Sequence, residues 1–388
     1  ECTCLPIHPS IHTCIIIIML SRGRALIKYR RQYIARMSSD RPTKKIRSAL
    51  EDIDDSGAFK RTESKFREFI SVDHPEFTPD ANRYHLYISY ACPWANGTLC
   101  MLRLKGLEKF IGVSITHYSW QRTRPDDPND THAGWVFRSP TDAPIVPMSG
   151  QGSMPCDGCI PDPLNNAASI RDLYDLSNDT NGKYTVPVLW DKKTNCIVNN
   201  ESQEILRMFN SSFNHLLPEG SKERELDLYP AHLVADIDAA NEWIYDKINN
   251  GVYRCGFAKT QGAYNSAVAE LYDALDRVEQ ILATNRYICG SQLTGMDLRL
   301  FMTLIRYDEV YVVYFKCNKR PISSYVNTTN YMRELYQHPV IGSVIRMDHI
   351  KGHYFTSHTN LNCYSIIPAG PGVLEDMQLP HDRNRFQK

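Results

Sequence analysis

The sequence predicts an α/β domain followed by an all-helical domain. Two observations support this prediction. Up to about residue 215, β-rich runs alternate with helix-like runs in the order strand, helix, strand, helix, hairpin, helix. Beyond that point, apolar residues recur at three- and four-residue steps, as in the stripe Leu233, Ile237, Ala240, Ile244 and Ile248. The element order of the first part is that of a thioredoxin-like fold.

Length and composition suit a globular protein of two domains: the chain has 388 residues, of which 42% are hydrophobic and 23% are charged. The 44 basic residues balance the 44 acidic ones, so nothing indicates a nucleic-acid partner. The 12 cysteines are scattered along a long chain, which favours reduced thiols in an intracellular compartment. The close pair Cys156-x-x-Cys159 has no second pair at zinc-ligand spacing, so we expect no metal site.

The N-terminal residues have an unusual composition. Residues 1–36 carry arginines and lysines with no acidic residue between Glu1 and Asp40, which is typical of a mitochondrial transit peptide. We favour the alternative that residues 1–36 are a leader preceding a start at Met37, which predicts a cytoplasmic protein. The apolar run 14–20 is too short to span a bilayer, so we expect no membrane partner.

The predicted elements of the first domain follow one another in order. Residues 37–80 are polar and are interpreted as an arm over the body of the protein. The thioredoxin-like domain, residues 81–215, is predicted to contain strands at 82–88, 110–116, 183–191 and 196–202 and helices at 92–105, 169–176 and after Ser202. Pro187 argues against an ordinary central strand and favours a strand end or a special turn, with a cis peptide bond as one form. Residues 121–165 read as an insertion of a size that usually carries function or is disordered.

The second domain is predicted to span residues 216–363. A second apolar stripe, starting at Val268, supports another long helix. Thr294-x-x-Asp297 is a capping box, which makes a structural role the interpretation for the Asp297 carboxylate. The Pro/Gly-rich residues 364–388 are interpreted as an extended strap.

Cys92 is the candidate nucleophile, because it stands between a strand-like run and a helix-like run. Pro93 favours the first helical turn, and the free N–H groups and dipole of a helix start favour thiolate over thiol. These features predict a lowered pKa; the alternative is a buried, inert cysteine. Ala95 occupies the place of a second cysteine in a Cys-x-x-Cys motif, so an external thiol must resolve any mixed disulfide.

The domain order and the Cys-Pro-Trp-Ala motif resemble the cysteine-type glutathione transferases. More narrowly, the chain resembles the glutathionyl-hydroquinone reductases, the xi class, over about residues 82–382. Seven blocks in the right order carry this resemblance, namely 83–87, 91–95, 185–191, 197–202, 251–258, 306–311 and 351–354.

The resemblance implies a reaction and roles for four residues. Cys92 would attack the sulfur of a glutathionyl-hydroquinone, release the hydroquinone, and be resolved by a second glutathione with release of oxidised glutathione. The carbon leaving group needs a proton, and Tyr253 is implied as its donor. Tyr311 and Tyr354 are implied nearby, where they help to stabilise the thiolate. A homodimer is expected from the same resemblance.

A glutathione site is expected beside Cys92. Val186 can pair its backbone with the cysteinyl part of glutathione, as a strand edge pairs with an added strand. Glu201 can accept the γ-glutamyl ammonium and Ser202 can donate to its carboxylate at a helix N-terminus, although both residues also suit a simple helix cap. The resemblance adds Trp135, Lys183, Tyr184 and Thr185 to this site.

Two departures from the family pattern concern the rate and the glutathione affinity. Asn96-Gly97-Thr98 replaces the usual His-Arg-Thr, which removes a positive charge and costs about 1 kcal/mol of helix stability at the glycine. Lys183 stands where arginine is usual and offers a point charge instead of a fork. Two other functions remain open: an omega-like thioltransferase or dehydroascorbate reductase, and a catalytically weak glutathione-binding protein.

Overall fold

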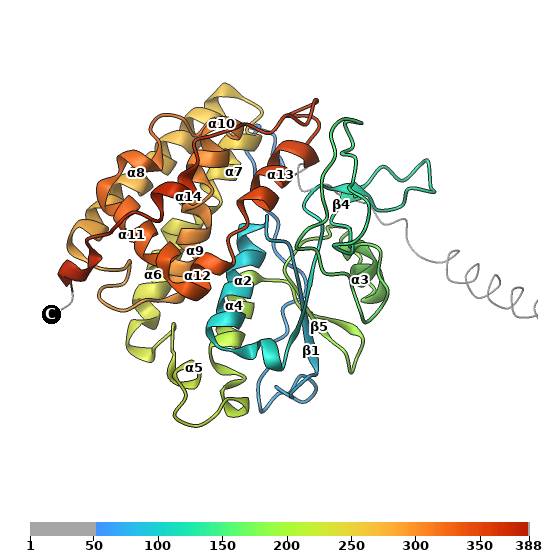
Figure 1. The fold of residues 1–388 in the computed structure, drawn as a ribbon, viewed down its shortest axis with the longest axis horizontal. Helices are drawn as coiled ribbons and strands as arrows, with labels where there is room; N and C mark the ends of the chain where they lie inside the picture. The colour runs from blue at the N-terminus through green and yellow to red at the C-terminus, as the bar shows by residue number, and fades with distance from the viewer. Residues whose placement is uncertain (1–51, 387–388) are drawn as a thin grey trace, which may run out of the picture. The chain divides into compact units, whose positions relative to one another are not determined.

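The computed structural model describes residues 52–386, and Figure 1 shows their elements. The predicted leader, residues 1–36, lies outside the described residues, as do residues 37–51 of the predicted arm. Among residues 52–386, no helix is both long enough and apolar enough to cross a lipid bilayer.

A four-stranded mixed sheet forms the centre of the first half, with strand order β2–β1–β5–β6. Strand β1 (Tyr84–Ile88) is parallel to β2 (Gly112–Ile115) and antiparallel to β5 (Val188–Asp191), which pairs in turn with β6 (Cys196–Asn199). Every residue of β1 is buried, as expected for an inner strand covered by helices. The α/β prediction for this half is confirmed, whereas the domain boundary near residue 215 stays a prediction.

Helix α2 (Pro93–Leu104) follows β1 and carries ten buried residues among its twelve. It packs against α4 (Ser202–Ser211) and, in the helical half, against α9 (Gly295–Leu304), as Figure 1 shows. Helices as well as the sheet surround α2, so it is buried on nearly every side. The short helix α3 (Ile170–Leu176) begins at a capping box formed by Ser169 and Asp172.

The predicted hairpin is shorter than the sequence suggested. Residues 183–187 form an irregular segment instead of a strand, and the Val186–Pro187 peptide bond is cis. The second strand ends at Asn199 because Glu201 caps α4 with its side chain, which accepts a hydrogen bond from the backbone of Gln203. The strand predictions for 183–187 and 200–202 were therefore wrong.

The insertion 121–165 is ordered and packs against the edge of the sheet. It contains the short strands β3 (Gln121–Arg122) and β4 (Ala133–Gly134), which pair with each other. The Ile160 backbone pairs with Ile115 of β2. Cys156 and Cys159 are buried beside apolar residues of the same insertion.

The second half is helical, as predicted. Its helices are α5 (Lys222–Glu225), α6 (Val234–Ile244), α7 (Gly251–Phe257), α8 (Gln261–Thr284), α9, α10 (Val312–Tyr314), α11 (Val326–Gln337), α12 (Pro339–Ser343), α13 (Met347–Ser357) and α14 (Val373–Asp376). Thr294 and Asp297 form the expected capping box at the start of α9. Two π-helical segments, Tyr245–Asn249 and Tyr307–Tyr311, precede α7 and α10. Such segments are frequent at functional sites.

Residues 52–80 of the arm contact both halves of the protein. Arg67 forms a backbone bridge with Asn199 at the edge of β6, and the Glu68 amide donates to the Val198 carbonyl at 3.1 Å. Toward the helical half, the Lys259 amide donates to the Gly57 carbonyl at 2.8 Å. The tail also lies on the helical half, where Glu309 accepts a 2.7 Å hydrogen bond from the Val373 amide.

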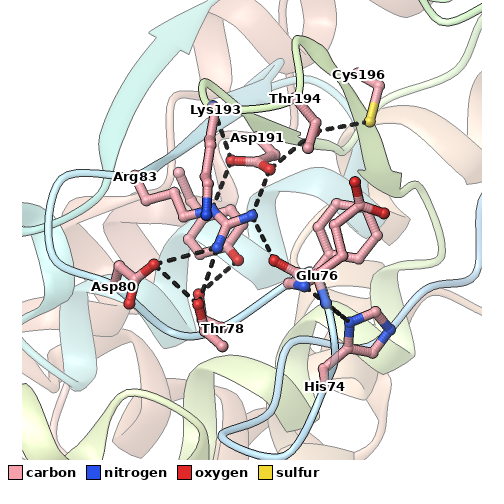
Figure 2. Close-up of polar contacts among 11 residues, drawn as sticks. His74, Glu76, Thr78, Asp80, Arg83, Asp191, Lys193, Thr194 and Cys196 are labelled. Carbon is pink, nitrogen blue, oxygen red and sulfur yellow. Dashed lines mark hydrogen bonds and ion pairs between the residues drawn. The ribbon is translucent and has the colours of Figure 1, made fainter.

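Figure 2 shows how Arg83 joins the end of the arm to the sheet. Its guanidinium donates to both oxygens of Asp191, at 2.8 and 2.7 Å, which ties the start of β1 to the end of β5. The remaining donors reach the Glu76 carbonyl, Thr78 and Asp80 at 2.7, 2.9 and 3.1 Å. Arg83 and Asp191 are both buried, so Asp191 depends on Arg83 for its charge partner, while Arg83 has the more exposed Asp80 as a second one.

Candidate active site

One pocket, with a volume of about 110 Å³, brings together residues of the arm, the sheet half and the helical half. Eight of the eleven candidate site residues line it: Cys92, Trp135, Lys183, Tyr184, Thr185, Val186, Tyr253 and Tyr354. The lining residues that were not predicted come from the arm, from α2, from the insertion and the residue before it, and from the helical half. They are Phe59, Arg61, Trp94, Trp120, His132, Ala133, Gly134, Phe257, His353 and His358.

Cys92 occupies the N-cap position of α2, with Pro93 as the first helical residue. Its backbone is extended, as is usual at an N-cap, and the nearby Ala95 and Trp94 amides of the first turn act to lower the pKa of the thiol. The thiol donates a long hydrogen bond of 3.6 Å to the Val186 carbonyl. The candidate nucleophile therefore contacts the irregular segment that is predicted to bind glutathione.

The pKa of Cys92 differs from the sequence expectation. Burial raises the pKa of this thiol, and this effect exceeds the lowering by the Ala95 and Trp94 amides and by the charges of Arg306 and Arg61. The predicted lowering of the pKa was therefore wrong for the protein without glutathione. Cys92 as a residue nevertheless remains partly exposed and lines the pocket.

The three predicted tyrosines form a hydrogen-bonded chain. The hydroxyl of Tyr354 lies 2.6 Å from that of Tyr253 and 3.1 Å from that of Tyr311. Burial raises the pKa of all three, so they are protonated at neutral pH. Tyr311 does not line the pocket itself and reaches it through Tyr354. The three hydroxyls are thus linked in series, and two of these residues, Tyr253 and Tyr354, line the same pocket as Cys92.

Arg306 supports the turn that carries Cys92, a role that sequence reasoning missed. The buried guanidinium donates to the Tyr90 and Ala91 carbonyls at 2.9 and 3.2 Å and to Met302 at 2.6 Å. Arg306 opens the block 306–311 that marked the family resemblance, but a bond to main-chain carbonyls leaves no sequence pattern of its own.

Histidines and tryptophans form one wall of the pocket. The Trp135 ring stacks on His353 with centroids 4.4 Å apart, and Trp120 meets Trp135 edge-on. The His353 Nδ1 donates to the Tyr118 carbonyl at 2.9 Å, because a carbonyl only accepts. Burial lowers the pKa of His353 well below its usual value and that of His358 to about 4, so both rings are neutral at neutral pH. Their role could not be read from the sequence because their partners are distant along the chain.

The arm reaches the predicted glutathione-binding segment. Lys183 forms an ion pair with Asp52 and donates to the Thr62 hydroxyl at 2.8 Å. The neighbouring Thr185 is held by Tyr174, whose hydroxyl donates to the Thr185 carbonyl at 3.0 Å. These contacts join residues that are far apart in the sequence and leave no pattern in either segment. The sequence therefore predicted an arm but not the surface that the arm contacts.

Glu201 and Ser202 do not line the pocket. Glu201 accepts from the Gln203 amide at 3.2 Å and from the Ser64 hydroxyl at 3.0 Å, which is the helix-cap alternative. Ser202 lines a separate cavity of about 10 Å³ together with Arg299. Their role toward glutathione stays a prediction. No group of three or more His, Cys, Asp or Glu residues suited to a metal gathers within the described part of the chain.

Comparison with known proteins agrees with this arrangement. Residues 91–212 match the glutathione S-transferase N-terminal domain, and residues 261–334 match the glutathione S-transferase C-terminal domain. The glutathionyl-hydroquinone reductase YqjG of Escherichia coli (strain K12) is 43% identical over 337 residues, which are 84% of this chain and 93% of that protein.

Solved structures give the same result. The crystal structure of the glutathione S-transferase Xi from Phanerochaete chrysosporium has a TM-score of 0.74 and 47% identity, covering 85% of this chain and 97% of that one. The glutathione-bound structure of YqjG from Escherichia coli K-12 has a TM-score of 0.71 and 41% identity, covering 82% and 96%. This chain therefore belongs to the glutathione S-transferase superfamily of enzymes and, within it, to the glutathionyl-hydroquinone reductases of the xi class.

Proposed function

We propose that this protein reduces glutathionyl-hydroquinones to hydroquinones at the expense of glutathione. The observation that carries the proposal is that Cys92 and Tyr253 line one pocket, with Tyr253 hydrogen-bonded to Tyr354. This pairing joins a thiol nucleophile to an acid that burial keeps protonated at neutral pH. Cleavage of a bond between sulfur and carbon needs such an acid, whereas cleavage of a disulfide does not.

The first step forms an S–S bond and breaks a C–S bond. The Cys92 thiolate attacks the glutathionyl sulfur, and the electron pair of the C–S bond passes to the ring carbon, which takes a proton from Tyr253. The hydroquinone leaves, and Cys92 remains as a mixed disulfide with glutathione. A second glutathione returns a proton to Tyr253 and attacks this disulfide as a thiolate, which releases oxidised glutathione and restores the Cys92 thiolate.

Glutathione is proposed to bind along residues 183–186, with its cysteinyl backbone beside Val186 and with Trp135, Tyr184 and Thr185 as walls. Lys183 would hold a glutathione carboxylate, and Glu201 and Ser202 would hold the γ-glutamyl group. Because Lys183 pairs with Asp52 in the protein without glutathione, the carboxylate would replace or share that partner. Lys183→Gln should then raise the KM for glutathione more than it lowers kcat.

The decisive experiment follows hydroquinone release from a glutathionyl-hydroquinone in the presence of glutathione. The wild-type protein should release hydroquinone and oxidised glutathione in equal amounts, and Cys92→Ala should abolish both products. Cys363→Ser is the matched control, because Cys363 is exposed and does not line the pocket. Absence of turnover by folded wild-type protein would contradict the proposal.

A disulfide substrate separates this function from that of a thioltransferase. If Tyr253 is the acid for a carbon leaving group, Tyr253→Phe should impair hydroquinone release far more than reduction of a mixed disulfide. An equal loss of rate with both substrates would favour the thioltransferase function.

We also propose that the protein forms a homodimer. Light scattering tests this proposal, and it should give a mass near twice the 44.5 kDa of one chain.

A further inference from the structure

Arg61, a residue of the arm, lines the pocket together with Cys92 and Tyr253. Its guanidinium carbon lies 5.1 Å from the centre of the Tyr253 ring and 5.3 Å from that of Trp94. Cation–π contacts of this kind hold a guanidinium in place without neutralising its charge. The arm therefore brings a positive charge to the reacting groups.

The hydrogen bonding of Arg61 leaves its charge uncompensated. Its Nε donates to the Asn250 side-chain oxygen at 3.0 Å, and within residues 52–386 it forms no ion pair. The other arm arginine on this stretch, Arg67, is bound to the Glu204 carboxylate instead. A cation that is partly withdrawn from water without an anionic partner is suited to a site where negative charge develops.

We propose that Arg61 compensates the negative charge that passes from Cys92 to Tyr253 during the first step of the reaction. The inference rests on the proposed function. Before the step, the charge is on the Cys92 thiolate; after it, Cys92 is in a disulfide and Tyr253, having given its proton to the ring carbon, carries the charge as a phenolate. Arg61 forms and breaks no covalent bond. It lines the pocket beside both groups, so one cation serves both ends of the transfer.

Lys183, another cation that lines the pocket, pairs with Asp52. Arg306 keeps its charge, because its partners are main-chain carbonyls, and it lowers the pKa of Cys92 together with Arg61. Unlike Arg61, Arg306 does not line the pocket. The remaining titratable residues that line the pocket are His132, Tyr184, His353, Tyr354 and His358. Burial lowers the pKa of each of these three histidines, to about 4 for His132 and His358, so they carry no charge at neutral pH.

The electrostatics of the two reacting groups agree with this role. Burial raises the pKa of both Cys92 and Tyr253, and Arg61 is among the charges that lower both. In each case the positive charge stabilises the anionic form, as a nearby cation must. The same side chain therefore acts on the thiolate and on the phenolate.

The test compares three arm variants. Arg61→Gln removes the charge, Arg61→Lys keeps it, and Arg67→Gln removes an arm cation that pairs with Glu204 outside the pocket. The pH dependence of Cys92 alkylation by iodoacetamide is followed by mass spectrometry of the Cys92 peptide. We expect the midpoint to rise by about one pH unit in Arg61→Gln, the effect of removing one charge near the thiolate in a partly solvated pocket. Arg61→Lys and Arg67→Gln should stay near the wild-type midpoint.

The second measurement is hydroquinone release. Arg61→Gln should lower kcat at least about tenfold, in step with the thiolate fraction. The same substitution should lower kcat by a smaller factor when it is made in the Tyr253→Phe variant. Thermal unfolding of each variant shows whether a lower kcat comes from a general loss of folding. If the charge is what matters, Arg61→Lys should keep a kcat near that of the wild type.

The outcomes separate this inference from the proposed function. An unchanged alkylation midpoint and an unchanged kcat in Arg61→Gln would reduce Arg61 to an anchor of the arm, while hydroquinone release by the wild type would still stand. Conversely, absence of release by the wild type would contradict the proposed function and with it the transfer of charge to Tyr253. The alkylation titration would still report whether Arg61 acts on the thiolate.

Discussion

The hydroxyl oxygens of Tyr253 and Tyr354 lie 2.6 Å apart at the wall of the pocket that contains Cys92. Tyr311 continues the chain behind them, with its hydroxyl 3.1 Å from that of Tyr354. Hydrogen bonds from neighbouring hydroxyls stabilise a phenolate, so the other two tyrosines make it easier for Tyr253 to lose its proton. The farther a tyrosine lies from the pocket along this series of hydroxyls, the less its removal should slow the reaction.

Tyr253→Phe should lower the rate of hydroquinone release by about a hundredfold, because it removes the proton donor. Tyr311→Phe should have a smaller effect, since Tyr311 acts through Tyr354. Single-turnover measurement of hydroquinone formation, with excess enzyme, isolates this step from resolution by glutathione.

Tyr264→Phe provides the control, because the Tyr264 hydroxyl bonds to the Lys316 carbonyl and does not line the pocket. If Tyr253→Phe and Tyr264→Phe release hydroquinone equally fast, Tyr253 is not the acid.

Alkylation of Cys92 in the protein without glutathione should increase with pH through and beyond about 8.5, the ordinary cysteine value. The sign follows from the raised pKa: at neutral pH the thiol holds its proton, and the reactive thiolate appears only as the pH approaches the elevated value. The rate of iodoacetamide labelling of the Cys92 peptide measures this. A plateau already reached below pH 7 would mean that the helix start and the two arginines outweigh burial.

The nucleophile was predictable because its signals are local. Cys92 and Pro93 mark a helix start by their own identities, and α2 begins and ends within one residue of the prediction 92–105. The capping box of Thr294 and Asp297 was predictable for the same reason.

The electrostatic setting of the nucleophile was not predictable. Arg61 and Arg306 reach the Cys92 environment from positions 31 residues before it and 214 after it, by contacts that only the fold creates. Burial of the thiol, which reverses the expected direction of its pKa, is likewise a tertiary property. The same holds for residues 183–187, where β-rich composition predicted a strand but the chain lines the pocket as an irregular segment.

Asp191→Asn should destabilise the protein by about 3–5 kcal/mol, because it leaves the Arg83 charge buried without its bidentate partner. Asp80→Asn is the matched control: Asp80 also bonds to Arg83, but its side chain is 56% exposed, so a loss below about 1 kcal/mol is expected. Urea unfolding measures both values. Equal losses in the two variants would contradict the assignment of the buried pair as the anchor of β1 and β5.

The same pair predicts a pH dependence of stability. Burial raises the pKa of Asp191, but hydrogen bonds from Arg83, the Lys193 amide and Thr194 outweigh it, so the pKa is lowered. A carboxyl whose folded-state pKa is depressed contributes stability that is present above its unfolded value, about 3.9, and is lost as the pH falls through the folded-state value. The free energy of unfolding of the wild type should therefore fall below about pH 4 more steeply than that of Asp191→Asn.

Gly97→Ala should stabilise the protein by up to about 1 kcal/mol. Gly97 lies inside α2, where glycine is a poor helix former relative to alanine. A Cβ at this position would come no closer than 3.9 Å to another residue, the Met302 Cγ, which is ordinary van der Waals contact. The departure from the family motif at this position should therefore cost helix stability that a single methyl group restores, and thermal unfolding measures the gain.

Gly256→Ala is the opposite case and serves as the control. Gly256 also lies inside a helix, α7, but a Cβ there would stand 2.1 Å from the Phe315 Cδ1. Phe315 is fully buried against Tyr253 and Phe257, so its ring has little room to move, and a loss of about 1–3 kcal/mol is expected. If both alanine variants unfold at lower temperature than the wild type, the space beside Gly97 is filled in solution and helix propensity does not govern that position.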